Sequence, residues 1–154
     1  MSRMPEDHAM VDIEKICADA IENAAELGVE LRYQPEDIAE LENRVMPVFS
    51  EWLRNGTITE NKGAWNLAVQ FGIYLGETML RNYAAKYGYH WGTPDGDLPV
   101  LMKDGGNQMS PITKVHKRIL NGAEDSIKSF YDVGVFIADG RFDAARRDLR
   151  PHQE

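Results

Sequence analysis

The sequence predicts an α+β fold, a mainly helical single domain with a small antiparallel β-hairpin or three-stranded sheet between the third helix and the C-terminal helices. Apolar residues recur at spacings of three and four through most of the 154 residues, which is the period of an α-helix. Two short strand-like runs at 89–93 and 98–102 flank the turn sequence Pro-Asp-Gly-Asp, a pattern typical of a hairpin. The length is sufficient for one domain with its own core.

The first two helices are predicted from their apolar stripes and their ends. The first covers residues 9–27 and is followed by Gly28, a residue that commonly ends helices. Alternation of apolar and polar residues predicts a short extended segment at 29–33. Pro35 suits the first position of the second helix, and Pro47, which lies inside that helix, is expected to kink or split it.

The third predicted helix is the most apolar and is expected to be covered on more than one side. Thr59 is a suitable N-cap, and Gly88 suits a left-handed C-cap. Gly72 and Gly76 lie four residues apart on one face, which predicts close approach of another segment. Glu77 is the one carboxylate of the apolar half, and we interpret it as a rim residue or a hydrogen-bond partner of a nearby loop rather than as a functional acid.

The segment after the hairpin carries two further helices. A brief third strand is expected at 108–109, after a Gly-Gly turn. Ser110 is predicted to cap the next helix, with Pro111 in its first turn. The last helix is expected to begin near 124–125 and to end at about residue 140.

The domain boundaries and the compartment follow from composition. Residues 1–140 are predicted to form the single domain, and residues 141–154, with four arginines, a loosely ordered tail. Cys17 is the single cysteine, so no internal disulfide is expected, and we interpret its thiol as buried packing. The N-terminus lacks the apolar stretch of a signal peptide and no transmembrane segment is present, which predicts a cytoplasmic protein.

Net charge divides unevenly along the chain. Residues 1–60 hold 14 Asp/Glu and 5 Lys/Arg, a net charge of −9, whereas residues 61–154 hold 11 and 12, a net +1, which together give −8. An acidic surface repels nucleic acid and anionic lipid and attracts a basic partner, although acidic helices are also common as merely solvated surfaces. The candidate partner-binding residues are Tyr33 as an aromatic anchor among Glu22, Glu26, Glu30, Glu36, Asp37 and Glu40.

No catalytic, cofactor or metal site is predicted. His90 and His116 have no His, Cys or Glu neighbour at ligand spacing, and His8 and His152 lie in the terminal segments. Ser110 and His116 lack a nucleophile-elbow pattern around the serine, and no Gly-Lys-Ser/Thr follows the Gly-Gly turn. A modest basic patch on the later helices could contact an anion but is more typical of a solvated surface; it consists of Lys114, Lys117, Arg118 and Lys128.

Several segments between residues 29 and 131 resemble a group of small uncharacterised bacterial proteins and polymorphic-toxin immunity proteins. The residues that carry this resemblance are Leu31-Arg32-Tyr33 with Pro35-Glu36-Asp37-Ile38, Phe71-Gly72-Ile73-Tyr74-Leu75-Gly76-Glu77, His90-Trp91, and Pro111-Ile112 with Val115-His116-Lys117-Arg118 and Asp125-Ser126-Ile127. The resemblance implies an α+β domain without known catalysis, whose relatives are often encoded beside toxins. The resemblance implies no catalytic residue at any position of this sequence.

Together, charge and resemblance lead to an expected function. We expect a cytosolic immunity protein, not an enzyme, that binds and neutralises a basic bacterial toxin domain, with no nucleic acid, membrane or cofactor involved. The alternative is a housekeeping protein-interaction or regulatory domain of unknown role.

Overall fold

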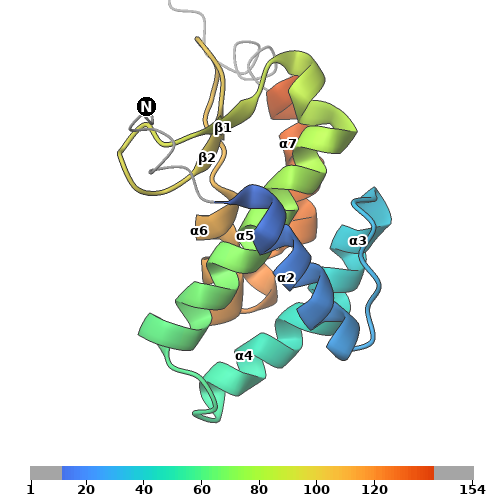
Figure 1. Ribbon diagram of the computed structural model, residues 1–154, viewed down its shortest axis with the longest axis vertical. Coiled ribbons are helices and arrows are strands. Elements are labelled where there is room, and N and C mark those ends of the chain that lie inside the picture. Colours follow the sequence, from blue (N-terminus) through green and yellow to red (C-terminus); the bar gives the residue numbers. More distant parts are fainter. Residues whose placement is uncertain (1–11, 141–154) are drawn as a thin grey trace, which may run out of the picture.

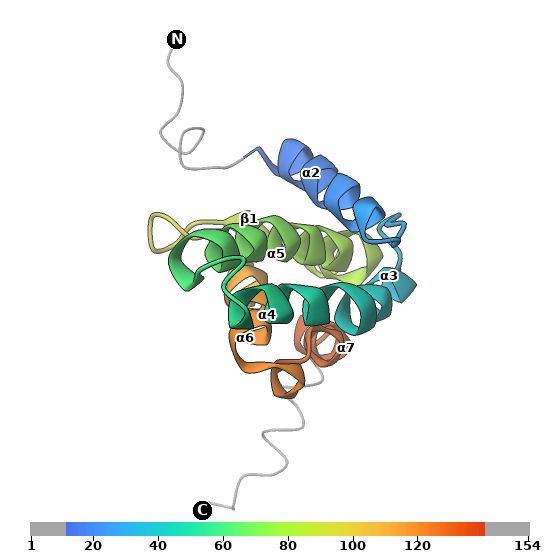
Figure 2. The ribbon, with the colours of Figure 1, turned by 90° about the horizontal axis from the view of Figure 1, so that it is seen from below.

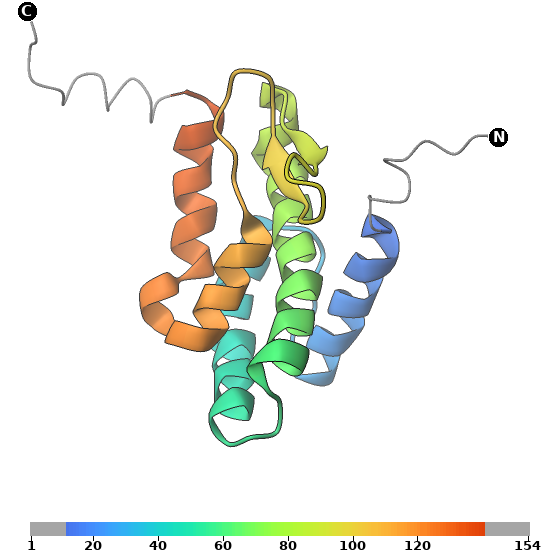
Figure 3. The same cartoon turned by 90° about the vertical axis from the view of Figure 1, so that its left-hand side faces the viewer.

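The central helix of the molecule is α5 (Trp65–Met79), around which the other helices pack (Figure 1). The computed structural model describes residues 12–140. Figures 2 and 3 show α2 along one side of α5, with α4, α6 and α7 on the other, and residues 71–76 of α5 are all buried. The surrounding helices are α2 (Ile13–Glu26), α3 (Pro35–Glu40), α4 (Met46–Arg54), α6 (Pro111–Asn121) and α7 (Ile127–Ala138). The predicted mainly helical α+β fold is confirmed.

Helix α2 begins after Asp12, whose carboxylate accepts a hydrogen bond from the backbone N–H of Lys15 at 3.1 Å. The predicted start at residue 9 lies outside the described residues. Gly28, at φ +85°, follows the helix end as expected. The extended segment predicted at 29–33 is not a strand, because its backbone groups near Tyr33 bond to side chains rather than to a neighbouring strand.

Helices α3 and α4 form one run that is interrupted by a π-helical turn at Leu41–Val45. Pro35 occupies the first turn of α3, as predicted. Pro47 lies in the first turn of α4, directly after this π-helical turn, which is wider than an α-helical one. A proline ring clashes with the carbonyl four residues back in a regular helix, and in the wide turn the Met46 N–H bonds instead to the Leu41 carbonyl, five residues back. The predicted interruption is therefore confirmed.

The ends of the third predicted helix are also confirmed. Thr59 accepts a hydrogen bond from the Lys62 N–H at 3.4 Å, and a π-helical turn at Glu60–Ala64 leads into α5. A second π-helical turn at Leu80–Ala84 and a 3-10 turn at Ala85–Tyr87 extend the run. Gly88 then ends it at φ +96°, a conformation that costs glycine little.

The sheet is the predicted hairpin. β1 (His90–Gly92) and β2 (Val100–Met102) pair antiparallel. Met109 adds an isolated antiparallel bridge to Leu101, at the position of the expected third strand. Leu101 and Met109 are 0% and 3% exposed, so the hairpin contributes to the common core.

Of the last two helices, α6 begins where the sequence predicts and α7 begins later. Pro111 starts α6 as expected, but the Ser110 hydroxyl donates to the Thr113 hydroxyl at 2.9 Å and makes no side-chain cap bond. Helix α7 begins at Ile127, because residues 123–125 form a separate 3-10 turn. Its cap is Ser126, whose hydroxyl accepts from the Ser129 N–H at 3.1 Å. The tail predicted at 141–154 lies outside the described residues.

The two glycines of α5 make the close contacts that their spacing predicts. A Cβ atom on Gly72 would lie 2.5 Å from the Ile112 Cα and 2.8 Å from its backbone nitrogen, distances that no real Cβ tolerates. A Cβ on Gly76 would overlap the ring of Trp91. The glycines therefore allow α6 and the hairpin to lie directly against α5.

Candidate protein-binding surface

Exposed carboxylates lie along the outer side of α2 and in the link that follows it. Glu22 and Glu26 are one turn apart and exposed, whereas the intervening Asn23 turns inward and donates to Gln70 of α5 at 2.7 Å. In the described part of the chain, neither glutamate takes part in an ion pair. Glu30 is exposed in the link and pairs with Arg32 at 2.8 Å.

Helix α3 carries the remaining predicted contact residues. Glu36 and Glu40 are exposed and one turn apart. Glu40 pairs with Arg44 at 2.9 Å, so its charge is partly balanced. The structure thus places five of the six predicted carboxylates on the surface, on α2, on α3 and in the link between them, and Figure 2 shows the end of α2 near α3.

Asp37 is the exception, because it is only 5% exposed. Its Oδ2 accepts hydrogen bonds from the Arg32 N–H at 2.6 Å, the Gln34 N–H at 3.0 Å and the Tyr74 hydroxyl at 2.6 Å. These bonds cap the start of α3 and satisfy the carboxylate away from water. The prediction of Asp37 as an exposed contact is therefore wrong: it stabilises the fold, and its reversal to lysine would disrupt folding.

Tyr33, the predicted aromatic anchor, is half-buried and has a φ of +59°. This left-handed conformation is uncommon for a bulky residue. The Tyr33 N–H donates to the Tyr74 hydroxyl at 2.9 Å, and its carbonyl accepts from Asn82 at 3.0 Å. The ring stacks on Tyr74 at 5.1 Å, with the Arg81 guanidinium 3.6 Å from its centre. These contacts hold the strained backbone in place.

Glu77 is engaged within the fold, in agreement with the sequence interpretation. Its Oε1 accepts from the Trp91 indole N–H at 3.1 Å, and its Oε2 from Arg81 at 3.2 Å. The carboxylate therefore connects α5 to β1 and orients the arginine that covers Tyr33.

Of the candidate reactive groups, Cys17 is buried and His116 is half-buried. Cys17 is 1% exposed, and burial raises the pKa of its thiol to about 11, so the thiol stays neutral near pH 7. His116 packs edge-on against Trp65 at 5.0 Å. Within residues 12–140, no three His, Cys, Asp or Glu side chains gather as metal ligands would.

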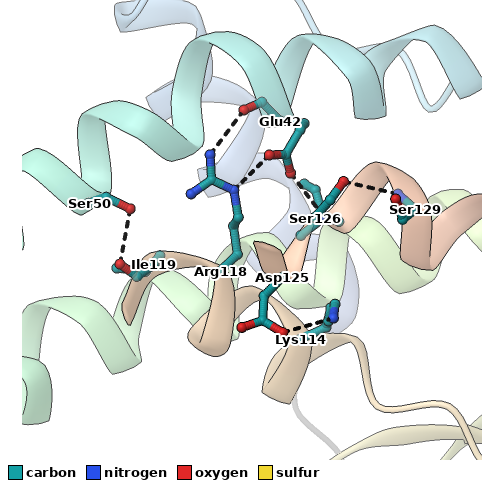
Figure 4. Close-up of polar contacts among 9 residues, drawn as sticks. Glu42, Ser50, Lys114, Arg118, Ile119, Asp125, Ser126 and Ser129 are labelled. Carbon is teal, nitrogen blue, oxygen red and sulfur yellow. Dashed lines mark hydrogen bonds and ion pairs between the residues drawn. The ribbon is translucent and has the colours of Figure 1, made fainter. Parts of the chain in front are cut away.

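Of the basic patch predicted on the later helices, Arg118 is buried, Lys114 and Lys128 are half-buried, and Lys117 is exposed. Arg118 is 4% exposed, and its Nε donates to Glu42 Oε2 at 2.7 Å (Figure 4). Glu42 Oε1 also accepts from the Ile127 N–H at 2.9 Å, so one carboxylate joins the start of α7 to α6. Glu42 entered the sequence analysis only as one of the 14 acidic residues of the segment 1–60. Its position four residues after the buried Ile38 was the signal that it points inward.

Comparisons with known proteins identify no relative. No family model, no curated protein and no solved structure matches the chain. Residues 12–140 also contain no helix with the length and apolarity needed to cross a membrane.

Proposed function

We propose that this protein is a cytosolic immunity protein that binds and neutralises a basic bacterial toxin domain without catalysis. The observation that supports the proposal most strongly is the set of exposed carboxylates on α2 and α3 whose charges are not all balanced locally. Glu30 and Glu40 have cationic partners. Within the described residues, Glu22, Glu26 and Glu36 have no such partner, although they are exposed.

Carboxylates without a nearby cation attract a positively charged partner over a distance, before the two proteins touch. A surface of one sign accelerates encounter with a basic domain and disfavours acidic competitors. A toxin that acts on a phosphate-rich substrate needs a basic active face, and an acidic protein bound there would block it. Tyr33 lies in the link between α2 and α3, and its ring is fixed by contacts with Tyr74 and the Arg81 guanidinium. Aromatic residues often dominate binding energy at interfaces.

A charge-reversal experiment with the product of a neighbouring toxin gene tests the proposal. The test variant carries Glu22→Lys, Glu26→Lys and Glu36→Lys. The matched control changes net charge equally at exposed positions elsewhere, with Asp95→Lys, Asp104→Lys and Glu124→Lys. Association rate and affinity are measured at two ionic strengths, together with protection of cells that express the toxin.

The proposal expects the test variant to associate at least about tenfold more slowly at low salt, with a flatter salt dependence, and the control to change much less. Cell protection should fall in parallel. Equal effects of both variants would show that only net charge matters and would contradict the proposed surface. Tight binding without protection would favour the alternative, an interaction domain of another role.

A further inference from the structure

An open hollow on the opposite side of the molecule from α2 is lined by both apolar and cationic side chains. It is lined by residues of the segment 108–110, of α6 and of α7, and Figure 3 shows the chain that leads into α6 passing beside α7, with α6 below. Its volume is about 310 Å³, at the lower end of the range of ligand pockets. None of the candidate partner-binding carboxylates lines it.

One wall of the hollow is apolar. Met109 is 3% exposed, and Phe130 and Ile137 are half-buried side chains packed against the core. Phe130 and Ile137 are seven residues apart on α7, which separates them by about 10 Å along the helix axis. This wall is long enough to cover an extended apolar body of several carbons.

The other wall carries positive charge in a protein of net charge −8. Lys114 and Lys117 line the hollow one turn apart on α6. The Lys114 ammonium also bonds to Asp125 at 3.2 Å, which holds it at the edge of the hollow. Lys117 is exposed and forms no ion pair within the described residues. Two lysines therefore border the hollow and one carboxylate, Asp125, lies nearby, which leaves one excess positive charge close to an apolar surface.

Hydrogen-bonding groups complete this wall. The hydroxyls of Ser110 and Thr113 line the hollow and bond to each other at 2.9 Å, and the Gln108 amide lies beside them. By contrast, a second hollow of about 320 Å³ at Trp65 and Leu98 is bordered by only one charged group, the carboxylate of Asp97. The α6–α7 hollow is thus the better combination of apolar surface and convergent polar groups.

We infer that the hollow between α6 and α7 binds a small organic anion, with its carboxylate or phosphate at Lys117 and Lys114 and its apolar body along Phe130 and Ile137. Both parts of the ligand contribute: the head group forms charge-assisted hydrogen bonds, and the body leaves water. This site is independent of the toxin-binding surface and remains open to test whether or not that proposal holds.

A ligand series separates these contributions in the full-length protein. Octanoate and octyl phosphate carry both parts and distinguish the two head groups. Acetate and inorganic phosphate lack the apolar body, and 1-octanol lacks the charge. Binding is measured by calorimetry and by the amide shifts of Met109 and Thr113 in NMR spectra. The variant Lys117→Gln is compared with Lys128→Gln, a lysine of α7 that pairs with Asp132 outside the hollow.

We expect octanoate or octyl phosphate to bind at least about tenfold more tightly than the three control ligands, a difference of about 1.4 kcal/mol or more. Lys117→Gln should weaken binding about fivefold or more, and Lys128→Gln less than about twofold. Equal binding of 1-octanol, equal losses in both variants, amide shifts confined to other regions, or no binding at millimolar concentration would each overturn the inference.

Discussion

Removal of either member of the Glu42–Arg118 pair should destabilise the protein far more than loss of a surface ion pair would. The two side chains are 10% and 5% exposed, and Nε and Oε2 are 2.7 Å apart. The test changes are Glu42→Gln and Arg118→Met, alone and together. Glu42→Gln retains a side-chain oxygen that can accept from the Ile127 N–H, so this change tests mainly the charge.

The expected loss of unfolding free energy depends on two opposing contributions, the attraction between the charges and the cost of removing them from water. At an effective dielectric constant of about 20, charges at this separation attract by about 6 kcal/mol. Dehydration costs several kcal/mol for each ion, so the pair as a whole contributes little net stability. Loss of one partner leaves the other charge buried and unmatched, and each single change should therefore cost about 3–5 kcal/mol. The double change should cost less than the sum, since no buried ion remains without its counterion.

Urea unfolding followed by circular dichroism measures the three free energies of unfolding. The coupling energy is the amount by which the double variant differs from the sum of the single ones. A coupling of about 2 kcal/mol or more would support the reasoning. Additive single effects below about 1 kcal/mol, the range of exposed pairs, would refute it.

Three further predictions concern packing, alkaline stability and capping. Gly72→Val should lower the free energy of unfolding by about 3 kcal/mol, because its Cβ would meet the Ile112 backbone, whereas exposed Ala25→Val should cost under about 1 kcal/mol in the same melt. Burial raises the pKa of Cys17 from 9.0 to about 11, so stability present below pH 9 should fall as pH rises through 11, and Cys17→Ala should flatten this fall; identical pH profiles would contradict it. Asp37→Asn should lower the melting temperature by several degrees through lost hydrogen bonds, and the exposed neighbour Glu36→Gln should leave it within about one degree.

Local signals in the sequence predicted the ends of the helical run that contains α5, and the close contacts of α5. Thr59 and Gly88 act through their own backbone neighbourhood, so their roles can be read from adjacent residues. The Gly72 and Gly76 spacing likewise revealed a face that another segment must approach, although only the structure shows that Ile112 and Trp91 fill it.

Long-range partners could not be predicted in the same way. Asp37 and Glu42 belong to an acidic half of the chain, and composition alone assigns them to the surface. Their burial depends on Tyr74 and Arg118, 37 and 76 residues away. At the start of α7, two neighbouring features of the sequence each suit a helix start. The acidic pair 124–125 suits a first helical turn, but the structure uses Ser126 as the N-cap, so the helix begins at Ile127.

The position of Glu42 has a consequence for synthesis on the ribosome. Chains emerge from the N-terminus, so α2, α3 and α4 are available long before the partners of Glu42, which follow 76 and 85 residues later. Until Arg118 and Ile127 emerge, burial of this carboxylate would leave it unmatched, at a cost of several kcal/mol. We therefore expect this side chain to stay in water during translation, and its native burial to become favourable only when α6 and α7 arrive.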